Sequence, residues 1–339
     1  MKYVVALTGV FLVIWCASVF LGAQAKALIM DPELGLIVPK EGSSVMRLTE
    51  GGACSHYAQH GLNEFVASRA LGNSKFFLLH GDSHIEAFQV PDESKPDAVL
   101  SRYLKGKAVA YGTGQSGYGF ASMIVRAKEY ERVMGIPIAH VFFTEMGLED
   151  DVLGDGMDEV RRTEKGFVRK AKKMSSRDML VRTLLNKTYL NFLIWRPTIE
   201  HLHLLPRWDK PSPADGGNKS RKEKLVSELV FVLDDMKCNL KAPSVIVYGR
   251  RIPSMSQGGI VSRVGDDDGE VALLERLTAE RGIGFLDVRG AALGLYEKRG
   301  LFANGFVNSH GPGSGHLNEM GIDAIFSAVA AYLRERYGL

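Results

Sequence analysis

Phe76-Phe77-Leu78-Leu79-His80-Gly81-Asp82-Ser83-His84 is the stretch of sequence that most limits the choice of fold. It starts with four apolar residues, which predict a buried strand, and continues into a Gly-Asp-Ser turn. A serine in a turn from strand to helix can hold its hydroxyl over the edge of a sheet, as a nucleophile needs. Serine is also a good helix N-cap, so this stretch by itself leaves both interpretations of Ser83 open.

From residue 71 onward, short apolar runs alternate with helical patterns, which is typical of a parallel sheet flanked by helices. Five runs predict strands, at Phe76–Leu79, Lys107–Tyr111, Ile138–Thr144, Ser244–Tyr248 and Gly284–Val288. Helices are predicted after the Gly-rich stretch 112–119, ending near Val133, and over Arg221–Lys237, Glu270–Arg281 and Asn318–Arg336. Ligands of such sheets bind beyond the carboxyl ends of the strands, so the chemistry is expected in the residues that follow each strand.

A histidine near the C-terminus is the candidate partner of Ser83. His316 stands just before the last predicted helix, and a serine hydroxyl needs a neighbouring base to accept its proton. A helix cap or an ordinary surface histidine is the alternative interpretation of His316.

The serine block, the Gly-rich stretch 112–119 and His316-Leu317-Asn318-x-x-Gly321 together resemble the SGNH hydrolases, also called the GDSL esterase and lipase family, from about residue 71 to the C-terminus. The resemblance implies an α/β chain with a three-layer, flavodoxin-like SGNH fold, a central five-stranded parallel sheet and, in this chain, a long helical insertion. It implies that Ser83 is the nucleophile, that His316 is the base, and that the backbone N–H groups of Ser83 and Gly117 form an oxyanion hole. It implies no metal and no organic cofactor.

Two elements of the family pattern are missing. The third predicted strand leads into Met146-Gly147-Leu148-Glu149-Asp150, where the family has a Gly-x-Asn-Asp-like element whose Asn donates to the oxyanion. The family also places an Asp shortly before the histidine, where this chain has Gly313 and Ser314. We therefore expect a Ser-His dyad whose imidazole is held by a carbonyl, a water or another polar side chain. The possible supporting residues are Asp82, His84, Asn308, His310 and Ser314.

The first 28 residues differ from the rest of the chain, because they are almost uncharged from Tyr3 to Ala25 and include the small-x-small ending Ala23-Gln24-Ala25. This pattern predicts either a cleaved signal peptide or an N-terminal membrane anchor. Both place the remainder outside the cytoplasm, as a periplasmic, secreted or membrane-anchored protein. The further divisions are an N-terminal extension over 29–70 and an SGNH hydrolase-like domain over 71–339. Cys54 and Cys238 are expected either to pair or to remain free thiols.

Charge is distributed unevenly along the chain. The 42 Lys and Arg and 39 Asp and Glu give a net charge of +3, and 45% of the residues are hydrophobic, which excludes an intrinsically disordered chain. Residues 161–187 hold ten basic and two acidic residues, a net +8, within an insertion of about 152–220. The basic segment predicts a solvated helical surface or, alternatively, a surface for an anionic polymer or a membrane. A nucleic-acid partner is not expected, because so mild an overall charge is atypical of that class.

The sequence thus predicts an exported serine esterase or O-acyltransferase acting on ester-linked acyl groups, especially acetyl groups, of a carbohydrate or cell-envelope substrate. The Gly-Asp-Ser-His form is also reminiscent of SGNH domains in bacterial polysaccharide O-acetylation systems. A catalytically impaired SGNH-fold protein that binds carbohydrate or assists envelope polysaccharide assembly is the alternative, and a role of the basic insertion as a membrane or partner dock is a third. The separation of the Ser83 hydroxyl and the His316 imidazole distinguishes the first two. The sequence does not identify the acyl group, its acceptor or the oligomeric state.

Overall fold

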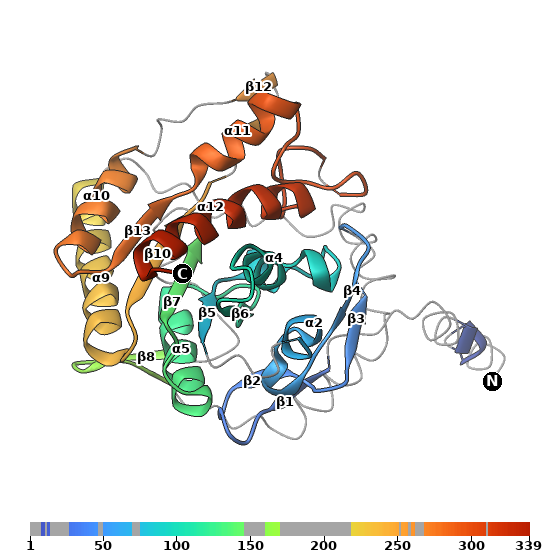
Figure 1. Cartoon of the computed structure of the whole chain (residues 1–339), viewed down its shortest axis with the longest axis horizontal. Helices are drawn as coiled ribbons and strands as arrows, with labels where there is room; N and C mark the ends of the chain where they lie inside the picture. Colours follow the sequence, from blue (N-terminus) through green and yellow to red (C-terminus); the bar gives the residue numbers. More distant parts are fainter. Residues whose placement is uncertain are drawn as a thin grey trace.

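A five-stranded, all-parallel sheet forms the centre of the molecule (Figure 1). The computed structural model describes residues 8–10, 12–13, 27–46, 50–69, 75–145, 160–169, 218–250, 252–256, 259–261, 268–309 and 311–339. The central strands are β5 (Phe76–His80), β6 (Val109–Gly112), β7 (Ala139–Thr144), β10 (Ser244–Tyr248) and β13 (Gly284–Asp287). All five predicted strands are therefore confirmed, with ends that differ by at most two residues.

The strands lie side by side in the order β13-β10-β7-β5-β6. Numbered along the chain from the first strand of the sheet, this is the flavodoxin-like order 2-1-3-4-5, which confirms the predicted fold class. The chain reverses direction across the sheet between β5 and β7, and a ligand crevice is expected at that switch point. Ser83 follows β5 directly, so the fold places it at this point.

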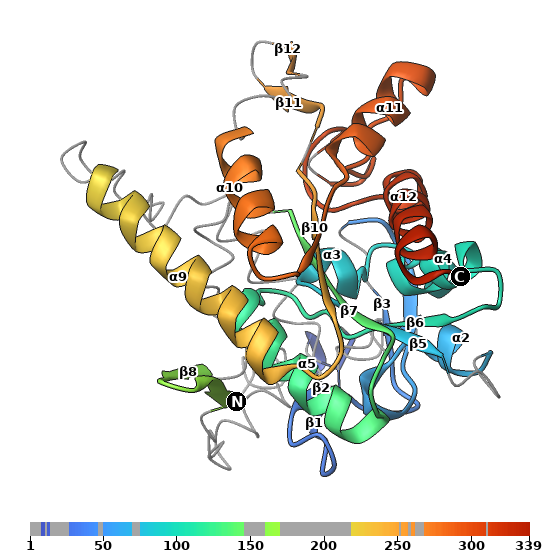
Figure 2. The ribbon, with the colours of Figure 1, turned by 60° about the vertical axis from the view of Figure 1, so that its left-hand side comes forward.

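Two layers of helices cover the two faces of the sheet (Figure 2). Alternating side chains of the strands pack with one layer or the other. Phe77, Val141 and Val247 pack with α4 (Pro96–Tyr103), α11 (Arg289–Arg299) and α12 (Glu319–Tyr337). Phe142 and Ile246 face the other way and pack with α5 (Phe120–Met134), α9 (Asn218–Asn239) and α10 (Asp268–Ala279). The period of two along buried strands thus produces a three-layer α/β arrangement with two cores.

Small elements of the N-terminal extension lie at the β6 end of the sheet, at a distance from α9 and α10 (Figure 1). They comprise the antiparallel pairs β1 (Leu28–Met30) with β2 (Ile37–Pro39) and β3 (Ser44–Met46) with β4 (Cys54–His56), then η1 (Gln59–Gly61) and α2 (Glu64–Ala67). Leu36 and Val38 pack with Leu78 of β5 and Tyr130 of α5, so the extension shares a core with the sheet. Beyond α3 (Ser83–Glu86), the chain continues through η2 (Asp92–Ser94) into α4.

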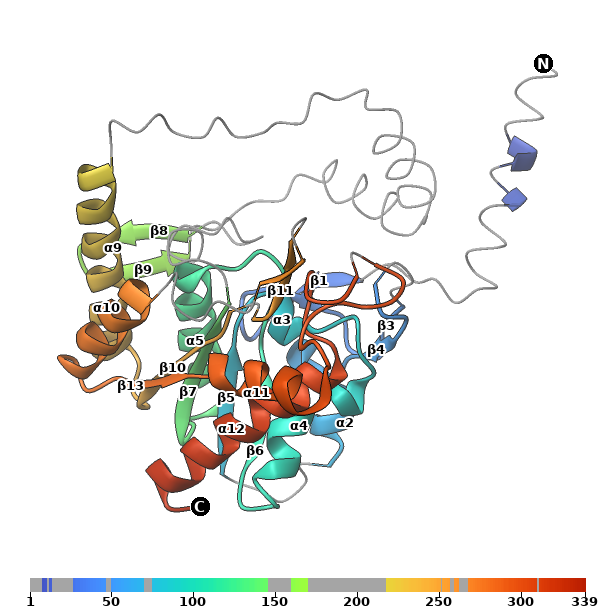
Figure 3. The same cartoon turned by 90° about the horizontal axis from the view of Figure 1, so that it is seen from above.

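Residues 160–169 of the insertion form a β-hairpin rather than a helix, made of β8 (Val160–Thr163) and β9 (Gly166–Arg169), and the hairpin lies beside α9 (Figure 3). The prediction of a helix used side-chain spacing alone and so could not include contacts with α9. In the structure, Asp235 of α9 accepts the Phe167 N–H at 2.6 Å and fixes the hairpin. Arg162 pairs with Glu228 of α9, so one of the basic residues is neutralised within the molecule. Residues 170–187 of the basic segment lie outside the described residues, and its predicted partner surface stays a prediction.

A further antiparallel pair, β11 (Ser254–Ser256) with β12 (Gly259–Val261), follows β10. Cys54 and Cys238 are both free thiols, the second of the two alternatives for this pair. No helix among the described residues is long and apolar enough to cross a membrane. Most of the predicted leader lies outside those residues, so both interpretations of the leader stay predictions.

Candidate active site

Ser83 is the first residue of the short helix α3, directly beyond the carboxyl end of β5. The N-cap of α3 is Asp82, whose carboxylate accepts the His84 N–H at 2.9 Å. The role of Asp82 is therefore to hold the turn, and the cap interpretation of Ser83 is wrong. The Ser83 hydroxyl is left available for a partner outside its own helix.

That partner is His316. Its Nε2 lies 2.9 Å from Ser83 Oγ, within hydrogen-bond distance, although the two residues are 233 positions apart. His316 does not cap α12 either, because the Asn318 side chain accepts the Gly321 N–H at 3.0 Å and is the cap. The structure thus brings together the two residues that the sequence motifs singled out.

A carboxylate holds the other side of the His316 ring, and it comes from the N-terminal extension. Glu50 Oε2 lies 2.7 Å from His316 Nδ1, and Glu50 Oε1 accepts the His316 backbone N–H at 3.0 Å. The expectation of a dyad without an orienting acid is therefore wrong. The acid is absent from the position before His316, and a residue 266 positions earlier replaces it.

Tight turns place Glu50 against His316. Gly51 has a φ of +79°, and a Cβ on it would lie 1.9 Å from the carbonyl oxygen of Gln89, so only glycine fits. The Gly51 N–H donates to Asn308 Oδ1 at 3.0 Å and its carbonyl accepts from Asn308 Nδ2 at 2.9 Å. Gly315 has a φ of +75°, and a Cβ there would lie 2.6 Å from Glu50 Oε1. Asn308, one of the predicted supporting residues, therefore acts on the Glu50 turn rather than on the imidazole.

The loop with the predicted oxyanion donor Gly117 runs from β6 to α5 and packs on α3. Gly117 has a φ of +81°, and its neighbour Ser116 donates its backbone N–H to Glu86 Oε2 at 3.0 Å. A Cβ on Gly114 would lie 2.5 Å from Ile85 Cβ, so the loop approaches α3 as closely as glycine allows. The loop is thus fixed next to the nucleophile helix, and the oxyanion role of Ser83 and Gly117 stays a prediction.

Ser314 and His84, two further predicted supporting residues, each bond to other groups. The Ser314 hydroxyl donates to the Gly311 carbonyl at 3.2 Å. His310 and the departure at Met146–Asp150 lie outside the described residues. His84 is 2% exposed and its Nε2 pairs with the equally buried carboxylate of Glu145, at the end of β7. A ring so buried is neither exposed beside the site nor able to line an open pocket.

Behind the serine block lies a second set of buried histidines. His80 Nε2 contacts His140 Nδ1 at 3.0 Å, and His140 Nε2 lies 3.5 Å from Glu131 Oε1. Burial lowers the pKa of His140 to about 4, although the Glu131 carboxylate acts in the opposite direction. Burial also lowers the pKa of His80 well below its ordinary value. Both rings are therefore neutral at pH 7, and they join β5 to β7 beneath the site.

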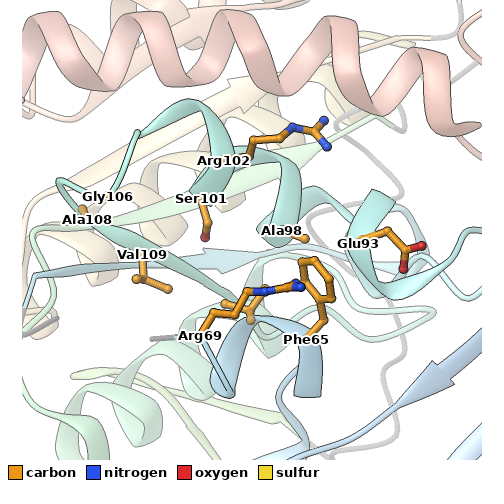
Figure 4. Close-up of a pocket in the computed structure, with 10 residues that line it drawn as sticks. Phe65, Arg69, Glu93, Ala98, Ser101, Arg102, Gly106, Ala108 and Val109 are labelled. Carbon is orange, nitrogen blue, oxygen red and sulfur yellow. The ribbon is translucent and has the colours of Figure 1, made fainter. Parts of the chain in front are cut away.

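A cavity of about 370 Å³ lies away from these residues, along the outer strand β6 and between α2 and α4 (Figure 4). Its wall includes Phe65 and Val109, and the Arg69 guanidinium stands over the Phe65 ring, 3.4 Å from its centroid. None of the residues that line it belongs to the Ser83 site. Within the described residues no group of three or more His, Cys, Asp or Glu side chains could hold a metal ion.

The fold and the site together define an α/β protein with a serine, a histidine and a glutamate in hydrogen-bonded sequence at the switch point of its sheet. In this order of contacts, the imidazole can take a proton from a serine hydroxyl while the carboxylate stabilises the resulting cation. The sequence motifs identified two of the three residues. For Glu50, the only signal in the sequence is a carboxylate before the turn-forming pair Gly51-Gly52.

No protein-family model matches the chain, and no curated protein matches it. Solved structures similar to it include a carbohydrate acetylesterase family member from Sinorhizobium meliloti, with 13% identity, 78% of this chain and 100% of that chain covered, and a TM-score of 0.41. A catalytic mutant of an acetylxylan esterase from Geobacillus stearothermophilus has 12% identity, 79% and 96% coverage, and a TM-score of 0.38.

Proposed function

We propose that this chain is an exported serine esterase or O-acyltransferase that acts on ester-linked acyl groups of a carbohydrate or cell-envelope substrate. The observation that carries the proposal is the unbroken contact from Ser83 Oγ to His316 Nε2 and from His316 Nδ1 to Glu50. A carboxylate only accepts hydrogen bonds, so Nδ1 carries the proton and the lone pair of Nε2 faces the serine hydroxyl. This is the tautomer that a general base requires.

The reaction would proceed through an acyl-enzyme. His316 takes the Ser83 proton as Ser83 Oγ attacks the ester carbonyl, and the N–H groups of Ser83 and Gly117 stabilise the oxyanion. The tetrahedral intermediate collapses when His316 returns the proton to the leaving alcohol. Water or a sugar hydroxyl then attacks the acyl-Ser83 ester, with His316 again as the base, which regenerates the free serine.

The alternative, a binding protein that has lost its catalytic supports, rested on two missing elements, the Asn of the third block and the orienting acid. Glu50 supplies a carboxylate at 2.7 Å from the imidazole in place of that acid, which favours the enzyme. Acetyl groups and a carbohydrate acceptor are proposed from the resemblance of the Gly-Asp-Ser-His block to the O-acetylation systems. Export is proposed from residues 1–28.

Ser83→Ala tests the proposal directly. Wild-type protein and the variant are compared on a small activated acetyl ester, and the wild-type chain is also examined by mass spectrometry for an acetyl group on Ser83. We expect the variant to lose at least about a thousandfold in kcat, because the nucleophile is removed. Ser327→Ala on α12, whose hydroxyl only bonds the Ala324 carbonyl, is the matched control.

Equal rates in the wild type and the Ser83→Ala variant would contradict the proposal. The choice between hydrolase and transferase is made by adding an oligosaccharide acceptor. A hydrolase releases acetate at an unchanged rate, whereas a transferase moves the acetyl group to the sugar.

A further inference from the structure

His84, the residue after the nucleophile, has both of its ring nitrogens engaged. Its Nε2 pairs with Glu145, and its Nδ1 accepts the backbone N–H of Leu317 at 3.4 Å. Leu317 follows the proposed base His316, and the centroids of the His84 and His316 rings are 5.1 Å apart. A buried imidazole thus links the end of β7 to the backbone next to the catalytic histidine.

The contacts of His84 define its protonation. A backbone N–H can only donate, so Nδ1 must offer its lone pair to Leu317, and the ring proton must lie on Nε2, facing the Glu145 carboxylate. His84 is therefore neutral and has no free lone pair with which to take a second proton. Its side chain is 2% exposed, so it cannot touch a substrate.

Glu145 is itself held from the far side. Its Oε1 accepts from Asn304 Nδ2 at 2.8 Å, and the same amide lies 3.3 Å from the carbonyl oxygen of Gly315. Asn304 also forms a β-bridge with Leu317, and the Gly305 N–H donates to the His316 carbonyl at 2.9 Å. The backbone on both sides of His316 is therefore tied to one buried network.

We propose that His84, oriented by Glu145, is a positioning residue that holds the backbone at His316 and Leu317 so that Nε2 of His316 stays in line with Ser83 Oγ. This inference rests on the proposed function of Ser83 and His316. The Glu50 carboxylate holds His316 by its Nδ1 and by its backbone N–H. His84 holds the next backbone N–H, that of Leu317. Shifts of about 1 Å at a reacting group can cost about a hundredfold in rate, so both supports affect turnover.

Two substitutions at His84 separate its hydrogen bonds from its bulk. His84→Phe keeps a ring of similar size and removes both hydrogen bonds. His84→Gln carries an acceptor and a donor on one amide group, which can serve Leu317 and Glu145 as the imidazole does. His56→Phe is the control, because His56 is another histidine paired with a carboxylate, Asp92, and its ring is half-exposed.

The measurement is the rate at which a fluorophosphonate labels Ser83, together with kcat and KM on an activated acetyl ester. In labelling, Ser83 Oγ bonds to phosphorus, fluoride leaves and the serine proton goes to His316, so the rate reports the Ser-His alignment without requiring the natural substrate. We expect His84→Phe to lower the labelling rate and kcat about ten- to a hundredfold with KM within about twofold. His84→Gln should recover most of the loss, and His56→Phe should match the wild type.

Wild-type labelling at Ser83 with an undiminished rate in His84→Phe would overturn the inference and leave the proposed function standing. Equal losses in His84→Phe and His84→Gln would also overturn it, because bulk rather than hydrogen bonding would then matter. A wild-type chain that is not labelled at Ser83 would overturn the proposed function and this inference with it. Where His84→Phe fails to fold, the double variant His84→Phe, Glu145→Leu removes the unpaired buried carboxylate as well, and the same loss of labelling is expected from it.

Discussion

Two histidine–glutamate pairs lie next to each other in this molecule and differ in what surrounds them. The His316 side chain is 24% exposed and that of Glu50 is 9% exposed, whereas those of His84 and Glu145 are both 2% exposed. In the first pair the second ring nitrogen faces a serine hydroxyl; in the second it accepts a backbone N–H.

The comparison shows that a histidine paired with a carboxylate becomes a base only if its second nitrogen keeps a usable lone pair. His316 can exchange a proton with Ser83 because its Nε2 faces the Ser83 hydroxyl. In His84 the corresponding lone pair, on Nδ1, already accepts the backbone N–H of Leu317. The pairing with an acid is thus common to both roles, and the partner of the other nitrogen distinguishes them.

Replacing the glutamate by glutamine should mainly lower kcat in the first pair and mainly lower stability in the second. Glu50→Gln should give the largest change. An amide at position 50 cannot accept from both the His316 backbone and Nδ1, and an NH2 group facing Nδ1 would favour the wrong tautomer. We expect kcat to fall about a thousand- to ten-thousandfold, as for an orienting acid replaced by its amide, with little loss of stability. Steady-state kinetics and chemical unfolding of the variant measure both quantities.

Glu145→Gln is the comparison variant. Because this carboxylate is buried and accepts from two donors, we expect a stability loss of about 1–3 kcal/mol, with a kcat loss closer to that of His84→Phe. Glu50→Gln at wild-type kcat would show that Glu50 does not orient the base.

The fully buried contact of His140 with Glu131 extends the comparison to stability. Folded His140 has its pKa lowered to about 4 by burial, against an ordinary value of 6.5. The unfolded chain therefore binds the proton first as the pH falls, so the stability is present above about pH 6.5 and is lost between 6.5 and 4. The difference of 2.5 between the two pKa values of His140 corresponds to a loss of stability on the order of 3 kcal/mol. The lowered pKa of His80 acts in the same direction.

His140→Gln tests this expectation by removing the titrating group. The free energies of unfolding of both proteins are measured from pH 7 to pH 4, and the variant should lose about 3 kcal/mol less over that range. Glu131 faces His140, and Arg126 and Thr113 face the neighbouring His80. All three residues are retained in the variant. Parallel stability curves for the two proteins would rule out His140 as the origin of the acid sensitivity.

The smallest effect is expected from Gly315→Ala, which disturbs the Glu50 pair without removing a functional group. Its methyl group would meet Glu50 Oε1 at 2.6 Å, so the carboxylate must move away from the His316 N–H. We expect about a tenfold loss in kcat. Gly311→Ala is a matched control, since Gly311 also has a positive φ, of +88°, but a Cβ there would meet nothing within 4 Å. An equal loss in the two variants would mean that backbone strain, rather than contact with Glu50, is responsible.

The sequence predicted the sheet and two of the three triad residues because their signals are local. Each strand is a short apolar run whose alternate residues fill two cores, and Ser83 and His316 stand in motifs at the ends of a strand and a loop. The helical character expected of the insertion is not found over residues 160–169, where contacts with Asp235 and Glu228 of α9 accompany a hairpin.

Glu50 and the burial of His84 depend on contacts between distant segments. The only local signal at Glu50 is the Gly51-Gly52 pair that follows it, which does not single out a partner of His316, and Glu145 is one of several acids in an acidic run. By itself, the sequence determined the parallel sheet and singled out Ser83 and His316 as the candidate nucleophile and base, because strand periodicity and short local motifs lie within single segments of the chain. Only the tertiary structure decided which acid orients the base and which histidine is buried, because the packing of the extension on the sheet brings together groups up to 266 residues apart.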